Sequence, residues 1–125
     1  MDRRTFTTWI EWYEAAWRTA GTDVLAQLFT DEATYTPSPF EDAIVGLAAI
    51  TEFWDAERRS HDEAFTLTAA LVAVEGDTGV ARIEVVYGDP PARYRDLWVF
   101  TLAADGRCRA FEEWPFFPGQ PRVAP

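Results

Sequence analysis

The sequence lacks several residue types that common site chemistries need. It has no lysine and no asparagine, a single cysteine (Cys108) and a single histidine (His61). One cysteine cannot form a disulfide within the chain, and the cysteine and histidine spacings of zinc sites are absent. The 21 acidic residues outnumber the 11 arginines and give a net charge of −10, which disfavours phosphate-rich partners. We therefore expect no metal, no cofactor, no nucleic acid and no anionic membrane as partners.

Long apolar runs are also missing. No stretch reaches the roughly 18 consecutive apolar residues of a membrane-spanning helix. Residues 1–5 lead into an amphipathic stretch without the apolar segment of a signal peptide, so a cytoplasmic protein is the default expectation. A length of 125 residues predicts one domain, residues 1–125, with an ordered core over about 6–118.

Large aromatic residues are the feature present in excess. They make up 15% of the chain and include six tryptophans and nine phenylalanines. This is more than a small core needs, and it suggests a lined cavity or a subunit interface.

Hydrophobic periodicity predicts helices first and strands afterwards. Residues 6–20 have helical spacing, with Trp9, Trp12, Tyr13 and Trp17 on one face. A short second helix, a short strand at 33–36 and a third helix at 47–59 follow, and then strands at 64–75, 80–88, 93–103 and 107–117. Because sequential hairpins place strands side by side, this order predicts an α+β fold with three N-terminal helices packed on a curved antiparallel sheet.

Three segments carry a resemblance to a known family. They are Leu28–Tyr35 (LFTDEATY), Val45–Trp54 (VGLAAITEFW) and the final hairpin with Asp105–Cys108 (DGRC) and Phe111–Trp114 (FEEW). The chain resembles the nuclear transport factor 2-like superfamily, and within it SnoaL-like domain proteins, over residues 6–118. The resemblance implies a cystatin-like cone with an open mouth between the sheet and the first helix. It says little about activity, because this fold hosts many functions.

Ketosteroid isomerases share this fold, but their acids are missing here. Counted from Gly106, the acid of their oxyanion hole falls at Trp98, and no general base stands near residues 35–38. Tyr13 corresponds only approximately to their helix tyrosine. We therefore reject steroid isomerisation.

Limonene epoxide hydrolases give a distant but closer match. The resemblance places their arginine and first acid at Arg82 and Glu84, their second acid at Glu113 and their water-binding tyrosine at Tyr35, whereas Pro37 stands where they have asparagine. In such a set one carboxylate activates water and the other protonates an oxygen, with the arginine holding their protonation states apart. This predicts a cofactor-independent hydrolase, isomerase or cyclase.

Alternatives remain for each acid. Arg82 and Glu84 also fit a solvated strand face with ion pairs across strands. A bulge in the last strand would turn Glu112 rather than Glu113 inward, because a shift of one residue reverses every side chain. Asp96 is a further candidate on an otherwise apolar face, either as a buried acid with a raised pKa or as a hydrogen-bond acceptor for a loop.

The remaining candidates belong to the lining of the cone. The expected ligand-binding residues are Tyr13, Trp17, Phe40, Trp54, Trp98, Phe111, Glu112 and Trp114. Cys108 is expected to fill space, and His61 to cap or flank a helix end rather than catalyse. A non-catalytic binder of an apolar metabolite and a protein–protein module are the alternative functions. Homodimerisation through the outer sheet face is implied by the resemblance.

Overall fold

The computed structural model describes residues 1–58 and 64–123, and in this part of the chain three helices and six strands form. Their order is α1 (Arg3–Trp17), α2 (Leu25–Leu28), β1 (Phe29–Thr36), β2 (Ile44–Val45), α3 (Leu47–Glu57), β3 (Phe65–Glu75), β4 (Thr78–Gly88), β5 (Pro91–Leu102) and β6 (Cys108–Phe116). Each expected helix and strand has a counterpart, but the first helix ends at Trp17 rather than at residue 20, and the first strand begins at Phe29 rather than at residue 33. The two-residue strand β2 was missed, because so short a segment has no readable period.

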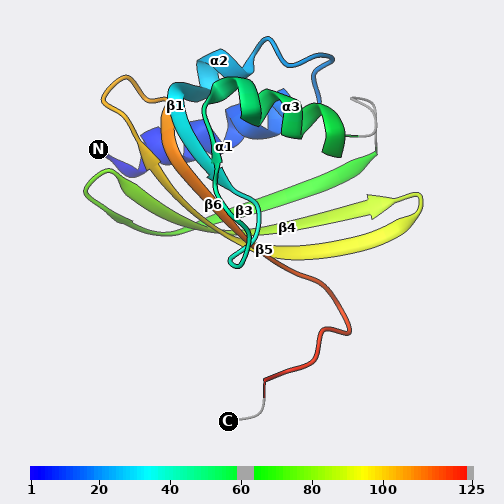
Figure 1. The fold of residues 1–125 in the computed structure, drawn as a ribbon. Coiled ribbons are helices and arrows are strands. Elements are labelled where there is room, and N and C mark those ends of the chain that lie inside the picture. The colour runs from blue at the N-terminus through cyan, green and yellow to red at the C-terminus, as the bar shows by residue number, and fades with distance from the viewer. Residues whose placement is uncertain (59–63, 124–125) are drawn as a thin grey trace.

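The three helices gather over one face of a curved sheet, and the segment after β6 runs away from both layers (Figure 1). The strand order is β2-β1-β6-β5-β4-β3. Each strand from β3 to β6 pairs antiparallel with the next one along the chain, as expected for a meander. β1 pairs parallel with β6. The α+β prediction is confirmed. We call the face toward the helices the inner face and the opposite one the outer face.

Helix α1 begins earlier than its hydrophobic pattern suggested. The Asp2 side chain accepts a hydrogen bond from the Thr5 backbone N–H at 3.0 Å and caps the first turn. The buried face consists of Phe6, Trp9, Ile10, Tyr13 and Ala16. The expectation that Trp12 shares this face is wrong: its side chain is 53% exposed, since it lies beside the stripe that meets the sheet.

Aromatic rings form the centre of the core between α1 and the inner face. Trp9 contacts the rings of Phe29, Phe100 and Phe111, at centroid distances of 5.8, 4.9 and 5.8 Å. Its indole N–H donates to the Leu28 carbonyl at 2.9 Å, so the buried polar atom is satisfied. Much of the aromatic excess is therefore core.

Gly79 shows how closely the helix approaches the sheet. A Cβ atom at this position would lie 2.5 Å from Cδ1 of Phe6, so any larger residue would have to displace the Phe6 ring. None of the helices among residues 1–58 and 64–123 is both long and apolar enough to cross a bilayer.

Candidate functional site

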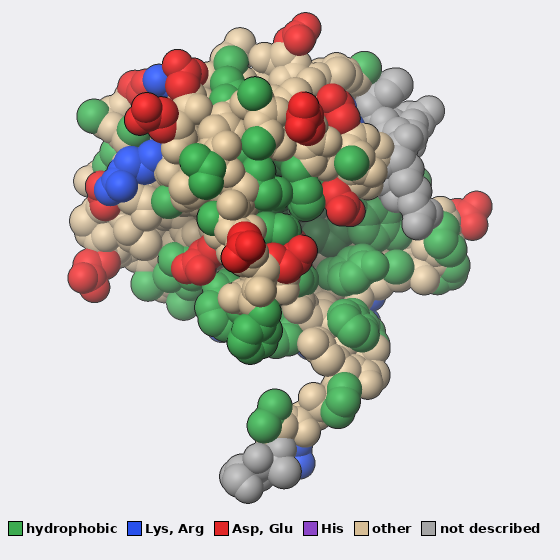
Figure 2. All heavy atoms as spheres, viewed as in Figure 1, with side chains coloured by type: hydrophobic (Ala, Val, Ile, Leu, Met, Phe, Trp, Pro, Cys, Tyr) green, Lys and Arg blue, Asp and Glu red, His purple; other side chains and the backbone are tan. Residues whose placement is uncertain are grey.

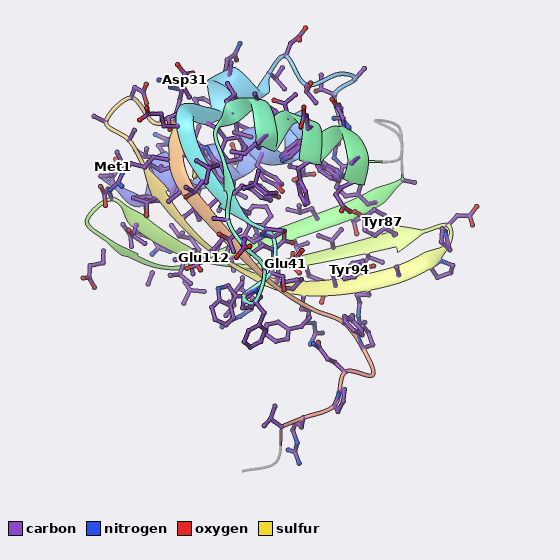
Figure 3. All side chains as sticks on the ribbon, viewed as in Figure 1. Met1, Asp31, Glu41, Tyr87, Tyr94 and Glu112 are labelled. Atoms are coloured by element: carbon purple, nitrogen blue, oxygen red, sulfur yellow. The ribbon has the colours of Figure 1, made fainter. Side chains whose placement is uncertain are left out.

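A cavity of about 400 Å³ opens between the helical layer and one end of the sheet. Figure 2 shows this hollow with hydrophobic side chains inside and acidic side chains near its edge. Its aromatic wall includes Tyr13, Trp17, Tyr35, Phe53, Tyr87 and Tyr94. Tyr87 of β4 and Tyr94 of β5 lie at the end of the sheet below α3, apart from Glu112 (Figure 3).

Two acids reach this cavity from neighbouring strands. Asp96 and Trp98 of β5 point toward the inner face, because side chains two residues apart on a strand share a face. Glu113 of β6 lies directly opposite Trp98, and Asp96 lies opposite Pro115. Asp96 and Glu113 are therefore diagonal neighbours across two paired strands. This register settles which of the two adjacent glutamates faces inward: it is Glu113.

The Asp96–Glu113 pair lies in an environment that disfavours two negative charges. Asp96 is only 6% exposed, and its Oδ1 has no hydrogen-bond donor among the N–H and hydroxyl groups of the described residues. Burial, a hydrogen bond with Asp96 and the charge of Asp96 together hold the pKa of Glu113 well above its usual 4.5. Glu113 therefore keeps its proton to a higher pH than an exposed glutamate does.

Two tyrosine hydroxyls border the acids. The hydroxyl groups of Tyr13 on α1 and Tyr35 on β1 lie 3.0 Å apart and form a hydrogen bond. Burial, with the nearby charge of Glu113 as a further cause, raises the pKa of both phenols well above 10, so both stay protonated. One hydrogen joins the two oxygens, and the other is available to an oxygen in the cavity.

A third acid stands at the rim. Glu57, in the last turn of α3, lines the same cavity while its side chain is exposed to solvent. Its charge also contributes to the raised pKa of Glu113. No sequence signal singled out Glu57, because exposed glutamates are common near the ends of helices.

Arg82 and Glu84 were expected to point into the cavity, but the structure places them on the outer face of the sheet. They alternate along β4 with the buried Ala81 and Ile83 and so point to the outer face, away from the cavity. The Glu84 carboxylate forms a 2.8 Å ion pair with Nε of Arg95, the residue opposite it on β5. This geometry corresponds to the alternative given for Arg82 and Glu84, a solvated strand face with ion pairs between strands.

The expected lining residues divide into three groups. Tyr13, Trp17 and Trp98 line the cavity. Trp54 and Phe111 are fully buried and belong to the core beneath it. Glu112 and Trp114 alternate with Phe111 and Glu113 and point to the outer face, and Phe40 is completely exposed on the loop between β1 and β2.

Other candidates take no part in the cavity. Cys108 is buried, and burial raises the pKa of its thiol to about 12, which leaves it unreactive at neutral pH. His61 lies outside the described residues. Within residues 1–58 and 64–123, no three His, Cys, Asp or Glu side chains are grouped so that they could hold a metal ion.

Sequence analysis missed Phe53, Tyr87 and Tyr94 as wall residues. Tyr87 and Tyr94 alternate in phase with Ile83 and Asp96, so the period of two along β4 and β5 was the available signal. Phe53 was recognised only as part of the apolar face of its helix. A helix pattern alone does not distinguish a side chain over a cavity from one in the core.

Solved structures share this fold at low sequence identity. SalBIII, an epoxide hydrolase/cyclase-like enzyme with a role in pyran ring formation in the polyether salinomycin, matches with a TM-score of 0.72 and 18% identity, over 92% of this chain and 93% of that one. A proposed SnoaL-like polyketide cyclase from Jannaschia sp. CCS1 matches with a TM-score of 0.66 and 19% identity, over 87% and 85%. An NTF2-like protein of unknown function from Cytophaga hutchinsonii ATCC 33406 gives 0.69 and 13%, over 90% and 97%.

At these identities the likeness establishes the fold and not the activity, and no curated protein matches the sequence. The expected nuclear transport factor 2-like architecture is confirmed. A family model of the SnoaL-like domain matches residues 9–111, which is most of the chain. This protein belongs to the SnoaL-like domain family.

Proposed function

We propose that this protein is an enzyme that binds a small, largely apolar molecule in the cavity and moves protons with Asp96 and Glu113. The observation that carries the proposal is a pair of acids, the buried Asp96 and the half-buried Glu113, that lines an aromatic cavity, with the pKa of Glu113 raised well above 4.5. A general acid must hold its proton at neutral pH, and a general base beside it must be ionised. In this proposal Glu113 is the acid and Asp96 is the base.

The two acids have complementary roles in this proposal. Asp96 accepts a proton from a carbon or hydroxyl group of the substrate, or from a water molecule, while Glu113 donates its proton to a substrate oxygen. The bond electrons released at the first atom flow toward the oxygen that Glu113 protonates. Asp96 then returns a proton to Glu113 across their hydrogen bond, which restores the starting state. No other reactant is needed for an isomerisation or ring closure, and hydrolysis consumes one water.

The tyrosine pair supports the same step. Because Tyr13 and Tyr35 remain protonated, the free hydroxyl hydrogen of the pair can stabilise negative charge that develops on a substrate oxygen. Tyr35 was expected to support catalysis from the sequence. Tyr13 extends that role to the first helix.

A non-catalytic binder is the second candidate, and the aromatic wall favours it. Most side chains around the cavity are apolar or aromatic, as in pockets that only hold an apolar ligand. Such a binder has no use for a protonated acid beside an ionised one. The two candidates therefore differ in whether the Asp96–Glu113 pair exchanges protons with the ligand.

Isotope incorporation distinguishes them. Small molecules that co-purify with the protein are identified by mass spectrometry and incubated with the protein in D₂O or in H₂¹⁸O. An isomerase or cyclase incorporates deuterium at carbon or converts the ligand, and a hydrolase incorporates ¹⁸O. Glu113→Gln should lower the rate by roughly 10²-fold or more, the usual contribution of a general acid.

The matched control removes an acid of the same kind from the surface. Glu32→Gln replaces an exposed glutamate of β1 and should keep the wild-type rate. If neither isotope enters the ligand and the ligand is unchanged, the proposal of an enzyme is wrong and the binder remains. Equal rates for wild type and Glu113→Gln would also contradict it.

We also propose that the protein forms a homodimer through the outer face. This face exposes a patch of apolar side chains that includes Val86, Leu97, Trp114 and Phe116, with Leu97 directly opposite Trp114. The charges beside the patch are of both signs, as a self-complementary interface between two identical copies requires. Light scattering should give the dimer mass for wild type and the monomer mass for Trp114→Glu. A monomeric wild type would contradict the proposal.

A further inference from the structure

The charge of the cavity is of one sign only. Its described lining includes three acids, Glu57, Asp96 and Glu113, and no arginine. The arginines that follow α1 and α3 have partners outside the lining acids: Arg18 binds Glu14 and the Phe65 carbonyl, and Arg58 binds backbone carbonyls that include Ala16 at 3.1 Å. The lining therefore brings acidic groups without an arginine partner among the described residues into a space with low-dielectric walls, in a protein of net charge −10.

The walls of the same space suit a positive charge. Aromatic rings attract cations through the negative potential of their faces. Phe65, a wall residue, already accepts one: the Arg18 guanidinium lies 3.8 Å from the centre of its ring. Trp17, Tyr35 and Phe53 line the cavity from the helices and β1.

A buried acceptor is available for such a ligand. Asp96 lines this cavity and is 94% buried, and no N–H or hydroxyl group of the described residues donates to its Oδ1 atom. Buried carboxylate oxygens normally accept at least one hydrogen bond. The neighbouring Glu113 can supply a single hydrogen, which leaves acceptor capacity on a carboxylate with two oxygens.

We propose that the cavity selects a cationic ligand, an ammonium group carried on an apolar frame, with Asp96 as the acceptor of its N–H and the aromatic wall around its carbon atoms. This inference rests on the proposed function in one respect: it names the class of molecule that would occupy the same cavity. Anionic ligands are excluded by the same charges, because nothing among the described lining residues compensates a carboxylate or phosphate.

The test uses three probes of nearly equal shape and different charge: benzylamine, benzyl alcohol and benzoate. Their dissociation constants at pH 7 are measured from shifts of backbone and indole N–H signals in ¹H–¹⁵N spectra of the full chain. Benzylamine should bind at least about tenfold more tightly than benzyl alcohol, because its hydrogen bond to a carboxylate is charge-assisted. Benzoate should bind more weakly than both, with the shifts of benzylamine centred on Trp17 and Trp98.

Two variants locate the selectivity. Asp96→Asn should remove most of the preference for benzylamine over benzyl alcohol, since the amide lacks the charge but keeps the shape. Glu32→Gln, which removes one surface charge, should keep the preference. If Asp96→Asn does not fold, as judged by its spectrum, the three-probe comparison in wild type decides alone.

The outcomes separate this inference from the proposed function. Benzyl alcohol that binds as tightly as benzylamine, benzylamine shifts away from the cavity, or no measurable binding of the amine at tens of millimolar would each overturn cation selectivity. None of these changes the isotope result for Asp96 and Glu113. Conversely, a preserved preference for benzylamine without isotope incorporation would overturn the enzyme and leave cation selectivity standing.

Discussion

The two faces of the sheet carry similar acids with opposite surroundings. On the inner face, Asp96 and Glu113 meet in a largely buried cavity, and no arginine is among the described residues that line it. On the outer face, Glu84 lies on the neighbouring strand in the open and forms a 2.8 Å ion pair with Arg95. The pKa of Glu113 is raised on the inner face, whereas the outer glutamate is paired with an exposed cation.

This contrast shows that strand parity, more than residue type, decides what an acid can do here. Successive residues of a strand point to opposite faces, so Ile83 is 1% exposed whereas the side chain of Glu84 is 37% exposed. A carboxylate with an arginine partner in water contributes little to stability or chemistry. A buried carboxyl without one has a raised pKa and holds its proton to a higher pH.

The largest effect should come from breaking the inner pair. Asp96→Asn removes the proposed base without changing shape, and turnover of the co-purified ligand should fall by roughly 10²- to 10⁴-fold, the range of general acid–base catalysis. Steady-state kinetics at pH 7 measure this loss, and circular dichroism checks the fold. Turnover within a factor of three of wild type would remove Asp96 from the mechanism.

Adjacent residues of β4 test the contrast through stability. Ile83 is 1% exposed, and Ile83→Ala should lower the free energy of unfolding by about 2–5 kcal/mol through lost burial and a cavity. Arg82 is exposed on the outer face, and Arg82→Ala should change the free energy of unfolding by only about 0.5 kcal/mol. Urea denaturation of the two variants measures both. Similar losses for the two would mean that the register of β4 is wrong.

The pH dependence of stability tests the raised pKa of Glu113. The folded protein binds the Glu113 proton more tightly than the unfolded chain, for which the pKa is near 4.5. The unfolded state therefore binds fewer protons over the window from about 4.5 up to the raised folded pKa, and Glu113 makes stability fall as pH rises through it. Each pKa unit of this window corresponds to about 1.4 kcal/mol.

Glu113→Gln should abolish the loss of stability that Glu113 causes as pH rises. The free energy of unfolding of the variant, relative to wild type, should therefore increase from pH 4.5 toward neutral pH. Asp2, Asp77 and Asp105 have lowered pKa values and act in the opposite sense at lower pH, but they are common to both proteins and cancel in the difference. Urea denaturation at a series of pH values measures it. A difference independent of pH would contradict the raised pKa.

The smallest effect should come from the outer face. Glu84→Gln removes one exposed ion pair with Arg95, so the free energy of unfolding should change by about 0–1 kcal/mol. Because the side chain points away from the cavity, turnover should stay close to wild type. A loss comparable to that of Asp96→Asn would return Glu84 to the catalytic set.

The fold was largely predictable from the sequence, and the candidate site only in part. Helical spacing around Trp9, strand alternation and the turn at Gly106 are local signals, and each predicted its element. Glu113 and Asp96 were both selected as candidates, but nothing in the sequence brought them together. Their meeting depends on the register between β5 and β6, which places Trp98 opposite Glu113.

The predictions that were wrong for site residues have related causes. Arg82 and Glu84 were placed by resemblance to another enzyme, and their own alternation with Ile83 was the better signal. Phe40 and Trp114 were assigned to the cavity because the loop after the first strand and the last strands were expected to line the cone. The direction in which that loop runs, and the face to which Trp114 points, depend on tertiary structure and on register.

The most direct measurement is the titration of the Glu113 carboxyl group by ¹³C NMR, in wild type and in Asp96→Asn. We expect the Glu113 pKa to lie well above 4.5 in wild type and to move back toward 4.5 in the variant, where the neighbouring charge is gone. A Glu113 carboxyl that titrates near 4.5 in wild type would contradict the raised pKa and the acid–base function that depends on it.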